Sequence, residues 1–262
     1  MQISLRDVAG QTLRVGVRPG RKSWPPLLLF NGIGASIELI EPFLAAFDGP
    51  EVLVFDVPGV GGSPAPRLPY RPSTLSLLSA RLLDQLGHER VDVLGVSWGG
   101  APAQQFAFQQ AKRCRRLVLA ATSPGHLMVP GKLTTMLRMA TPRRYKDPDY
   151  MTRVAGDIYG GVFRASPELA RAHLRHVHWS SDYGYYLQLI AALGWSSLPW
   201  LRLLPQPTLV MAGTDDPIVP VVNARILAKL IPHARLVTID DGHLFLLTSA
   251  RESAGIISEF LN

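Results

Sequence analysis

"VDVLGVSWGG" (91–100) joins an apolar run to a serine that is flanked by glycines. Continuous apolarity up to Val96 predicts a strand covered on both faces, and the following "GGAPAQQFAFQQA" (99–111) is compatible with a helix. A Gly-x-Ser-x-Gly pattern between a strand and a helix is typical of a nucleophile elbow, where small residues relieve crowding at a strained turn. The pattern alone would arise by chance in about one chain in ten of this size. Ser97 is therefore either a nucleophile or a small residue in a tight turn, and its partners decide between the two.

The same strand signal recurs along the chain, with segments of helix length between most of the runs. Apolar runs of strand length occupy 27–30, 51–57, 91–96, 116–122, 207–213 and 234–241. Runs without alternation belong to strands that are buried on both faces, so they predict a mostly parallel central sheet flanked by helices. The opening residues 1–19 predict a short antiparallel pair around the turn at Ala9 and Gly10. The expected fold class is α/β.

The regular alternation stops between about residues 125 and 200, where prolines interrupt short helical stretches. We expect a mainly helical lid inserted at 125–200 into a core made of 1–124 and 201–262. The insert holds six of the seven tyrosines, three of the five tryptophans and four of the six methionines. This bias suits the lining of a site for an apolar substrate or, alternatively, a small core of the insert itself.

Two later loops supply the partners that a serine nucleophile needs. A serine hydroxyl becomes reactive when a histidine takes its proton and a carboxylate orients that histidine. "GTDDPIVP" (213–220) and "DDGHLF" (240–245) each follow an expected strand, at the sheet edge where ligands of open α/β proteins bind. The chain order Ser97, Asp216, His243 is that of α/β-hydrolases and predicts a catalytic triad.

Local sequence suggests the acid and the groups that would bind the oxyanion. Asp215 is the alternative acid, and we favour Asp216 because Pro217 fixes the turn directly after it. The backbone N–H of Trp98 is the first expected oxyanion donor, since it follows the nucleophile and opens a helix. The second is the N–H of Ile33, in a loop whose glycines allow close approach to substrate; a plain glycine turn is the alternative.

Together these motifs resemble the α/β-hydrolase superfamily over nearly the whole chain. The resemblance is consistent with acyl transfer to water, in which Ser97 attacks an ester, His243 moves the proton and Asp216 orients the histidine. The usual His-Gly start of the family's oxyanion loop is replaced by Asn31-Gly32. This change leaves the backbone donors in place and the role of the first side chain open.

A closer resemblance extends from about residue 27 to 247 and includes the insert. It is carried by "LLLFNGIGASIELIEPF", "VLVFDVPGVGGSPAP", "LGVSWGGAPAQQFA", "MVPGK", "TPRRY", "DIYGG" and "DDGHLFL", which look like the intracellular depolymerases of medium-chain-length polyhydroxyalkanoates. The resemblance implies hydrolysis of poly(3-hydroxyalkanoate) in cytoplasmic storage granules, with binding at the granule surface. The reaction needs no metal or organic cofactor. The alternatives are a 3-hydroxyacyl transferase or thioesterase that uses the same acyl-serine, and a granule-surface binding protein without activity.

Composition narrows the expected partners and location. The 27 Lys and Arg against 20 Asp and Glu give a net charge of +7, but the basic residues are scattered and form no nucleic-acid-binding motif. We therefore expect no nucleic-acid partner. The sequence shows no signal-peptide core, no apolar stretch of membrane-spanning length and no pair of cysteines, which predicts a soluble cytoplasmic protein. Nothing in the sequence indicates an oligomeric state.

Two features invite other chemistry. "HLRHVHW" (173–179) offers His173, His176 and His178 as metal ligands, but a helix would turn His178 away from the other two. We expect a helical stretch with solvated or hydrogen-bonded histidines there. Cys114 has no histidine near it in the sequence, and we expect a core or helix-end thiol rather than a nucleophile.

Overall fold

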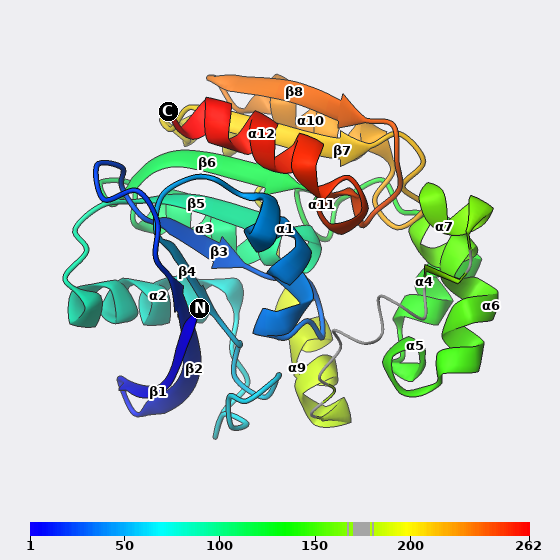
Figure 1. Ribbon diagram of the computed structural model, residues 1–262, viewed down its shortest axis with the longest axis horizontal. Coiled ribbons are helices and arrows are strands. Elements are labelled where there is room, and N and C mark those ends of the chain that lie inside the picture. Colours follow the sequence, from blue (N-terminus) through cyan, green and yellow to red (C-terminus); the bar gives the residue numbers. More distant parts are fainter. Residues whose placement is uncertain (167, 170–178, 180) are drawn as a thin grey trace.

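A sheet forms the middle of the molecule and has helices on both faces (Figure 1). The computed structural model describes residues 1–166, 168–169, 179 and 181–262. Within these residues eight strands follow the order β1-β2-β4-β3-β5-β6-β7-β8. The strands are β1 (Gln2–Val8), β2 (Gln11–Arg18), β3 (Leu27–Phe30), β4 (Val52–Phe55), β5 (Val91–Val96), β6 (Cys114–Ala120), β7 (Thr208–Gly213) and β8 (Ala234–Ile239). The pairs β1–β2 and β2–β4 are antiparallel and the others are parallel, which confirms the predicted fold class.

Both faces of the sheet are buried, as β3 illustrates. Leu27 and Leu29 pack on one face, Leu28 and Phe30 pack on the other, and none of the four is more than 1% exposed. The first face is covered by α1 (Glu41–Ala46), α11 (Phe245–Thr248) and α12 (Ala250–Leu261), and the second by α2 (Pro72–Leu86), α3 (Gly100–Gln109) and α10 (Val221–Leu230). Burial on both faces is the reason that the strand sequences lack polar alternation.

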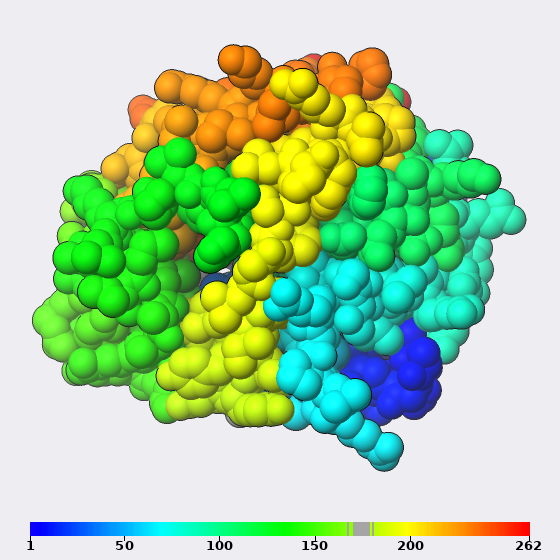
Figure 2. All heavy atoms as spheres, turned by 180° about the vertical axis from the view of Figure 1, so that it is seen from behind, coloured from blue at the N-terminus to red at the C-terminus, as the bar shows by residue number. Residues whose placement is uncertain are grey.

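The insert between β6 and β7 is helical. Its described helices are α4 (Leu133–Met139), α5 (Arg143–Lys146), α6 (Pro148–Tyr159), α7 (Val162–Ala165) and α9 (Asp182–Ala192), after which the short turn η3 (Leu201–Leu203) leads into β7. Helices α4 to α7 gather at one end of the sheet, and α9 lies apart from them (Figure 1). From behind, a small hollow separates the green part of the insert from its yellow part (Figure 2). Across the described ranges, no helix is long and apolar enough to cross a membrane.

The insert has a small core of its own. Met151, Ile158 and Phe163 pack there with Ile218 and Val219, which belong to the loop after β7. Part of the aromatic and methionine bias of the insert therefore stabilises its own packing. The same cluster joins the insert to the loop that carries Asp216.

Candidate active site

Ser97 occupies the sharp turn between β5 and the 3₁₀ turn η2 (Ser97–Gly99), which leads into α3. Its φ of +53° lies in the left-handed region, where a non-glycine residue is strained. The flanking glycines are required for space. A Cβ on Gly95 would lie 2.5 Å from a side-chain carbon of α3, and one on Gly99 would lie 2.2 Å from the carbonyl oxygen of Phe30. The Gly-x-Ser-x-Gly spacing thus permits a tight elbow at the carboxyl end of β5.

The structure brings Ser97, His243 and Asp216 into one hydrogen-bonded row. His243 Nε2 lies 2.8 Å from Ser97 Oγ, and His243 Nδ1 lies 2.7 Å from Asp216 Oδ2. Asp216 Oδ1 accepts the backbone N–H groups of Ile218 and Val219, both at 2.9 Å. With Asp216 as acceptor, the proton of a neutral imidazole lies on Nδ1, and Nε2 can accept the proton of Ser97. This geometry is suited to activating a serine nucleophile.

Asp215, the other acid of the doublet, points elsewhere. Its carboxylate accepts hydrogen bonds from Arg164 Nε at 2.6 Å and from the Gly161 N–H at 2.8 Å. The hydrogen bond from Arg164 lowers the pKa of Asp215 below its usual value. Of the two neighbouring acids, Asp216 contacts His243, and Asp215 ties the insert to the loop after β7.

The loop after β3 lies against the elbow. A Cβ on Gly32 would lie 3.8 Å from Ser97 Cβ, so the backbone of this loop comes close to Ser97. Ile33 lines the same pocket as Ser97, and its N–H donates no hydrogen bond to any residue that the structure describes. Trp98 lies in the first turn of η2, where N–H groups lack partners within the helix. Both N–H groups expected from the sequence therefore lie beside Ser97.

Asn31 braces this loop with its side chain. Its Oδ1 accepts the N–H of Gly32 at 3.0 Å, and its Nδ2 donates to the carbonyl oxygen of Ser36 at 2.8 Å. The side chain is buried, at 8% exposed. The asparagine at the usual histidine position thus holds the two ends of the loop together.

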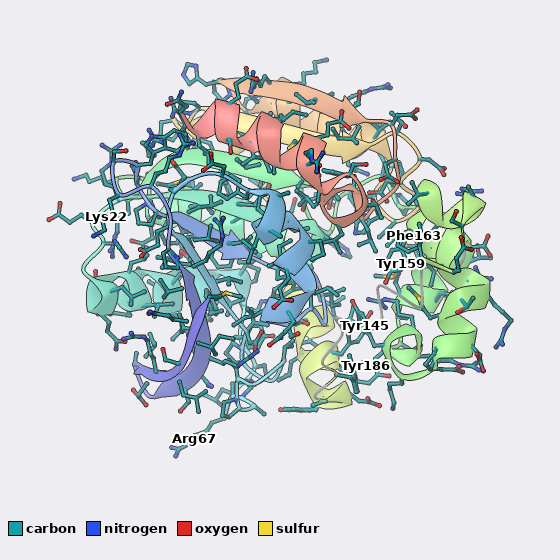
Figure 3. The ribbon with its side chains drawn as sticks, viewed as in Figure 1. Lys22, Arg67, Tyr145, Tyr159, Phe163 and Tyr186 are labelled. Atoms are coloured by element: carbon teal, nitrogen blue, oxygen red, sulfur yellow. The ribbon has the colours of Figure 1, made fainter. Side chains whose placement is uncertain are left out.

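An apolar pocket lies over Ser97. Its apolar wall includes Leu39, Ile40, Met139, Ile218, Leu244 and Leu247. Its polar wall includes Asn31, His243 and three residues of the insert, Arg144, Tyr145 and Tyr159. Tyr145 and Tyr159 lie between the helices of the insert and the rest of the molecule (Figure 3). The pocket thus combines an apolar surface with a few polar groups, as small-molecule sites usually do.

Two residues of the insert contact the loop after β3 and the elbow. Tyr145 Oη donates to the carbonyl oxygen of Ile33 at 2.7 Å, and Gln188 Oε1 accepts the N–H of Gly34 at 2.7 Å. The carbonyl oxygen of Gln188 also accepts Trp98 Nε1–H at 2.8 Å. Sequence reasoning missed both residues, because their partners are 90 to 154 positions away in the chain. "TPRRY" was a signal of family likeness and carried no indication of this role.

Arg144 is a further residue of the pocket that sequence reasoning missed. It is 1% exposed, and its guanidinium donates to the hydroxyls of Tyr145, Tyr159 and Tyr185. Burial disfavours its charge, but the three tyrosines raise the pKa of Arg144 above its usual value. Burial also raises the pKa of Tyr159 and of Tyr185. A charged arginine surrounded by tyrosine hydroxyls therefore lines the pocket.

Comparison with known proteins gives the family. A family model described as the alpha/beta hydrolase fold matches residues 25–250. The chain belongs to the alpha/beta hydrolase family. The fold described above, with its mostly parallel sheet and a serine elbow after β5, agrees with this membership.

Individual relatives of this alpha/beta hydrolase agree. A poly(3-hydroxyalkanoate) depolymerase of Ectopseudomonas oleovorans is 54% identical over 256 residues, which make up 97% of this chain and 90% of the relative. The crystal structure of a hydrolase from Pseudomonas aeruginosa PA01 has a TM-score of 0.81 at 26% identity and covers 99% of this chain and 98% of that one. The enol-lactonase from Burkholderia xenovorans LB400 has a TM-score of 0.82 at 24% identity, covers 98% of this chain and 99% of its own, and supports the fold. The resemblance inferred from the sequence is confirmed.

In this hydrolase Asp241 braces the loop that carries His243. Its Oδ1 accepts the N–H of Val162 at 3.1 Å, and its Oδ2 accepts the hydroxyls of Thr248 at 2.6 Å and Ser249 at 2.9 Å. Asp241 is 3% exposed. The carboxylate thus connects the insert, the histidine loop and α11.

The remaining candidates from the sequence lie outside this site. Cys114 is buried in β6, and burial raises the pKa of its thiol, as expected for a core cysteine. His173, His176 and His178 fall outside the described residues. In the part of the chain that is described, no three His, Cys, Asp or Glu side chains are grouped to hold a metal ion.

Proposed function

We propose that this chain hydrolyses the ester bonds of poly(3-hydroxyalkanoate) through an acyl-enzyme intermediate on Ser97. The observation that carries the proposal is the hydrogen-bonded row of Ser97, His243 and Asp216 beside an apolar pocket. The relative that is 54% identical is named a poly(3-hydroxyalkanoate) depolymerase, which supports a polyester as the substrate. Both findings point to a carboxylic ester hydrolase.

In the first half of the reaction Ser97 Oγ attacks the ester carbonyl while His243 Nε2 takes the hydroxyl proton. Asp216 stabilises the imidazolium that forms. The N–H groups of Ile33 and Trp98 donate to the oxygen that becomes negatively charged. When the carbon–oxygen bond of the ester breaks, His243 returns the proton to the leaving oxygen, which departs as an alcohol.

In the second half a water molecule takes the place of that alcohol. His243 removes a proton from the water, the hydroxide adds to the acyl carbon, and Ser97 leaves with its proton restored. The products are a carboxylate and the free enzyme. Ser97, His243 and Ile33 line one pocket, Asp216 contacts His243, and Trp98 follows Ser97 in the chain.

The pocket supports a substrate with aliphatic side chains. Its apolar wall would remove alkyl groups from water, at about 0.8 kcal/mol for each buried CH₂. A medium-chain-length 3-hydroxyalkanoate carries such an alkyl group on every repeating unit. We therefore place the alkyl chain of the reacting unit against Leu39, Ile40 and Leu247.

We assign the insert at 125–200 the role of a lid over the core formed by 1–124 and 201–262. Tyr145 and Gln188 hydrogen-bond the loop after β3, and Met139 lines the pocket, which supports this division. In this assignment the lid has two roles, because it covers the acyl site and helps to hold the oxyanion loop.

Contact with an insoluble polymer is assigned to α9. Tyr183, Tyr186 and Ile190 are 54%, 41% and 46% exposed, and their spacing of three and four places them along one side of the helix. Leu193, which is 59% exposed, follows directly after the helix. Exposed apolar side chains in a stripe commonly mark a binding surface. We propose that this stripe meets the surface of a storage granule.

The test of the proposed function compares two substrates. The protein is incubated with a suspension of a 3-hydroxyoctanoate polymer and, separately, with a 3-hydroxyoctanoyl thioester. Clearing of the polymer with release of 3-hydroxy acids supports the proposal. Turnover of the thioester with no change in the polymer would instead favour the thioesterase or transferase.

A second measurement addresses the α9 stripe. Replacing Tyr186 and Ile190 together by serine is expected to lower the fraction of protein that sediments with polymer granules. Hydrolysis of a soluble 4-nitrophenyl ester should stay within about twofold, because neither side chain lines the pocket. Equal sedimentation of the variant and the unchanged protein would contradict this part of the proposal.

A further inference from the structure

Arg144 is a buried cation without an anionic partner. The groups it contacts are the hydroxyls of Tyr145, Tyr159 and Tyr185 and the carbonyl oxygen of Thr141. No described carboxylate pairs with it. Residues 167, 170–178 and 180, which the structure does not describe, include no Asp or Glu. Burying an ion costs several kcal/mol, and a neutral oxygen offsets this cost less than a carboxylate does.

The donors of Arg144 are incompletely used. Its Nε donates to Tyr159 at 3.2 Å, its Nη1 donates to Tyr185 at 2.7 Å and to Thr141 at 3.4 Å, and its Nη2 donates to Tyr145 at 3.3 Å. These bonds account for four of the five N–H groups of a guanidinium. The second N–H of Nη2 has no described acceptor, and two of the four bonds are long. The guanidinium can therefore donate a hydrogen bond to one more oxygen atom.

The tyrosines keep their hydroxyl oxygens turned toward the guanidinium. Tyr185 Oη donates its proton to the carbonyl oxygen of Met139 at 2.5 Å, and Tyr145 Oη donates to that of Ile33 at 2.7 Å. Arg144 also lies over the ring of Tyr145, 4.3 Å from its centroid. These contacts hold the planar group in a defined orientation.

Arg144 is also close to the reacting groups. Tyr159 links Arg144 to His243. Its hydroxyl accepts a hydrogen bond from Arg144, and its backbone carbonyl oxygen accepts the N–H of His243 at 2.7 Å. Tyr145 connects Arg144 to the carbonyl of Ile33 in the same way. Arg144 lines the same pocket as Ser97. Tyr159 lies between it and His243, and Tyr145 lies between it and the loop that carries Ile33.

We propose that Arg144 binds the free carboxylate at the end of a 3-hydroxyalkanoate chain and so directs cleavage to ester bonds near that end. The proposal rests on the proposed function, because it concerns the substrate of the same site. The free N–H of Nη2 can donate to a carboxylate oxygen, and such a charge-assisted hydrogen bond is shorter and stronger than one to a neutral oxygen. Such a ligand would supply the negative charge that the pocket lacks, and the apolar wall would take its alkyl group.

The chemistry of the bond fixes which piece the arginine holds. When Ser97 Oγ forms its bond to the ester carbonyl, the bond from that carbon to the alkoxy oxygen breaks, and His243 protonates this oxygen. The leaving piece is then a 3-hydroxy acid, or a short oligomer that ends in one, with its carboxylate at Arg144. The remainder of the chain stays on Ser97 until water releases it. Shortening from the carboxyl end is the expected result.

The first test uses a 3-hydroxyoctanoate trimer in two forms, with a free carboxylate or with a terminal carboxamide of the same size. The unchanged enzyme is expected to show a kcat/KM about 10- to 100-fold higher for the free acid. In Arg144→Gln this ratio should fall to about one. Any loss that the substitution causes through Tyr145 or Tyr159 should be equal for the amide and for 4-nitrophenyl octanoate, which carry no carboxylate. Arg143→Gln is the matched control, since Arg143 precedes Arg144 in the chain but is exposed and pairs with Asp147.

The outcomes separate the two proposals. Equal use of acid and amide by the unchanged enzyme would overturn the carboxylate site and leave the esterase function intact. An equal loss on acid, amide and nitrophenyl ester in Arg144→Gln would also overturn it, because it would show a structural role. Failure to hydrolyse either trimer, with 4-nitrophenyl octanoate still consumed, would instead overturn the polyester assignment.

The second test needs no variant and holds even where Arg144→Gln does not fold. 3-Hydroxyoctanoate and 3-hydroxyoctanamide are compared as inhibitors of 4-nitrophenyl octanoate hydrolysis by the unchanged enzyme. The carboxylate should inhibit at a concentration at least about tenfold lower than the amide. Equal inhibition constants would contradict a cationic subsite.

Discussion

The arginines of the sheet and of the insert have opposite kinds of partner. On the sheet, Arg115 Nη2 lies 2.6 Å from the fully buried Asp92, and Arg14 pairs with Asp56 and Glu38. In the insert, Arg144 is the most buried of the three, and its partners are tyrosine hydroxyls and a carbonyl. The paired arginines hold the sheet and its loops together, whereas the unpaired one faces the pocket.

We assign the reaction to residues at the ends of the sheet strands, and the recognition of substrate to residues of the insert. The proposed nucleophile, base and acid all come from the ends of sheet strands, where the buried carboxylates Asp92 and Asp216 each have a partner. The insert adds Arg144, Tyr145 and Gln188, which line the pocket or hydrogen-bond the loop after β3. Substitutions at the strand ends should therefore abolish turnover, and substitutions in the insert should change its rate moderately or its choice of substrate.

The largest effect is expected from Ser97→Ala. Loss of the nucleophile should lower kcat for 4-nitrophenyl octanoate by about 10⁶-fold, and residual turnover would come from binding and the oxyanion donors alone. The free energy of unfolding should not fall, because alanine fits the elbow and the substitution leaves no buried charge without a partner. Urea titration provides the control. Residual activity above about 1% would show that the reaction does not depend on the elbow.

Asp216→Asn is expected to have the next largest effect. An amide that donates to Nδ1 favours the wrong tautomer of His243, and kcat should fall by about 10⁴-fold. Asp215→Asn is the matched control, since Asp215 pairs with Arg164 and should leave kcat within about threefold. A severe loss in the control and a mild one in Asp216→Asn would exchange the roles of the two acids.

Arg115→Met tests the buried pair on the sheet. The substitution leaves the fully buried Asp92 without its cation, and the free energy of unfolding should fall by about 3–5 kcal/mol. The double variant Asp92→Leu with Arg115→Met should recover most of that loss, because it removes the stranded charge. Specific activity of the folded protein should not change in either variant. If Arg115→Met instead lowered the ratio of acid to amide use, Arg115 would also affect substrate choice, which would contradict the contrast with Arg144.

Gln188→Met tests the hold of the insert on the oxyanion loop. The N–H of Gly34 loses its acceptor, which should lower the free energy of unfolding by about 1–3 kcal/mol. The value of kcat for a neutral ester should fall about tenfold. KM should stay within about twofold, because the loop places a donor for the transition state. The ratio of acid to amide use should also be unchanged, which distinguishes this residue from Arg144. A change confined to KM would argue against a positioning role.

The smallest effect is expected from Glu38→Gln and depends on pH. Pairing with Arg14 lowers the pKa of Glu38 from 4.5 to about 2, so the folded state binds its proton less readily than the unfolded state. The pair therefore stabilises the protein fully above pH 4.5 and loses this contribution as pH falls toward about 2. Urea titrations should show a difference of about 0.5 kcal/mol at pH 7 that shrinks below pH 4.5. A difference independent of pH would assign the effect to packing.

Most of the fold and the three residues of the row could be predicted from local sequence. Each parallel strand appears as an apolar run because both of its faces are buried, and the serine elbow needs glycines that remain visible in the sequence. Asp216 and His243 follow strands, where the topology of an α/β sheet gathers side chains at one edge. The choice of Asp216 over Asp215 came from a turn preference, and only the contact with His243 distinguishes them in space.

The sequence by itself determined the α/β class, the elbow and the order of its partners, because these depend on short patterns of polarity, size and spacing. The tertiary structure decided the pairing of buried groups. Arg144 reads as one more basic residue in "TPRRY", next to the exposed Arg143, until folding places it among three tyrosines and away from every described carboxylate. Whether a charge is neutralised depends on neighbours from distant parts of the chain, and in this protein that pairing distinguishes a structural arginine from one that we propose binds substrate.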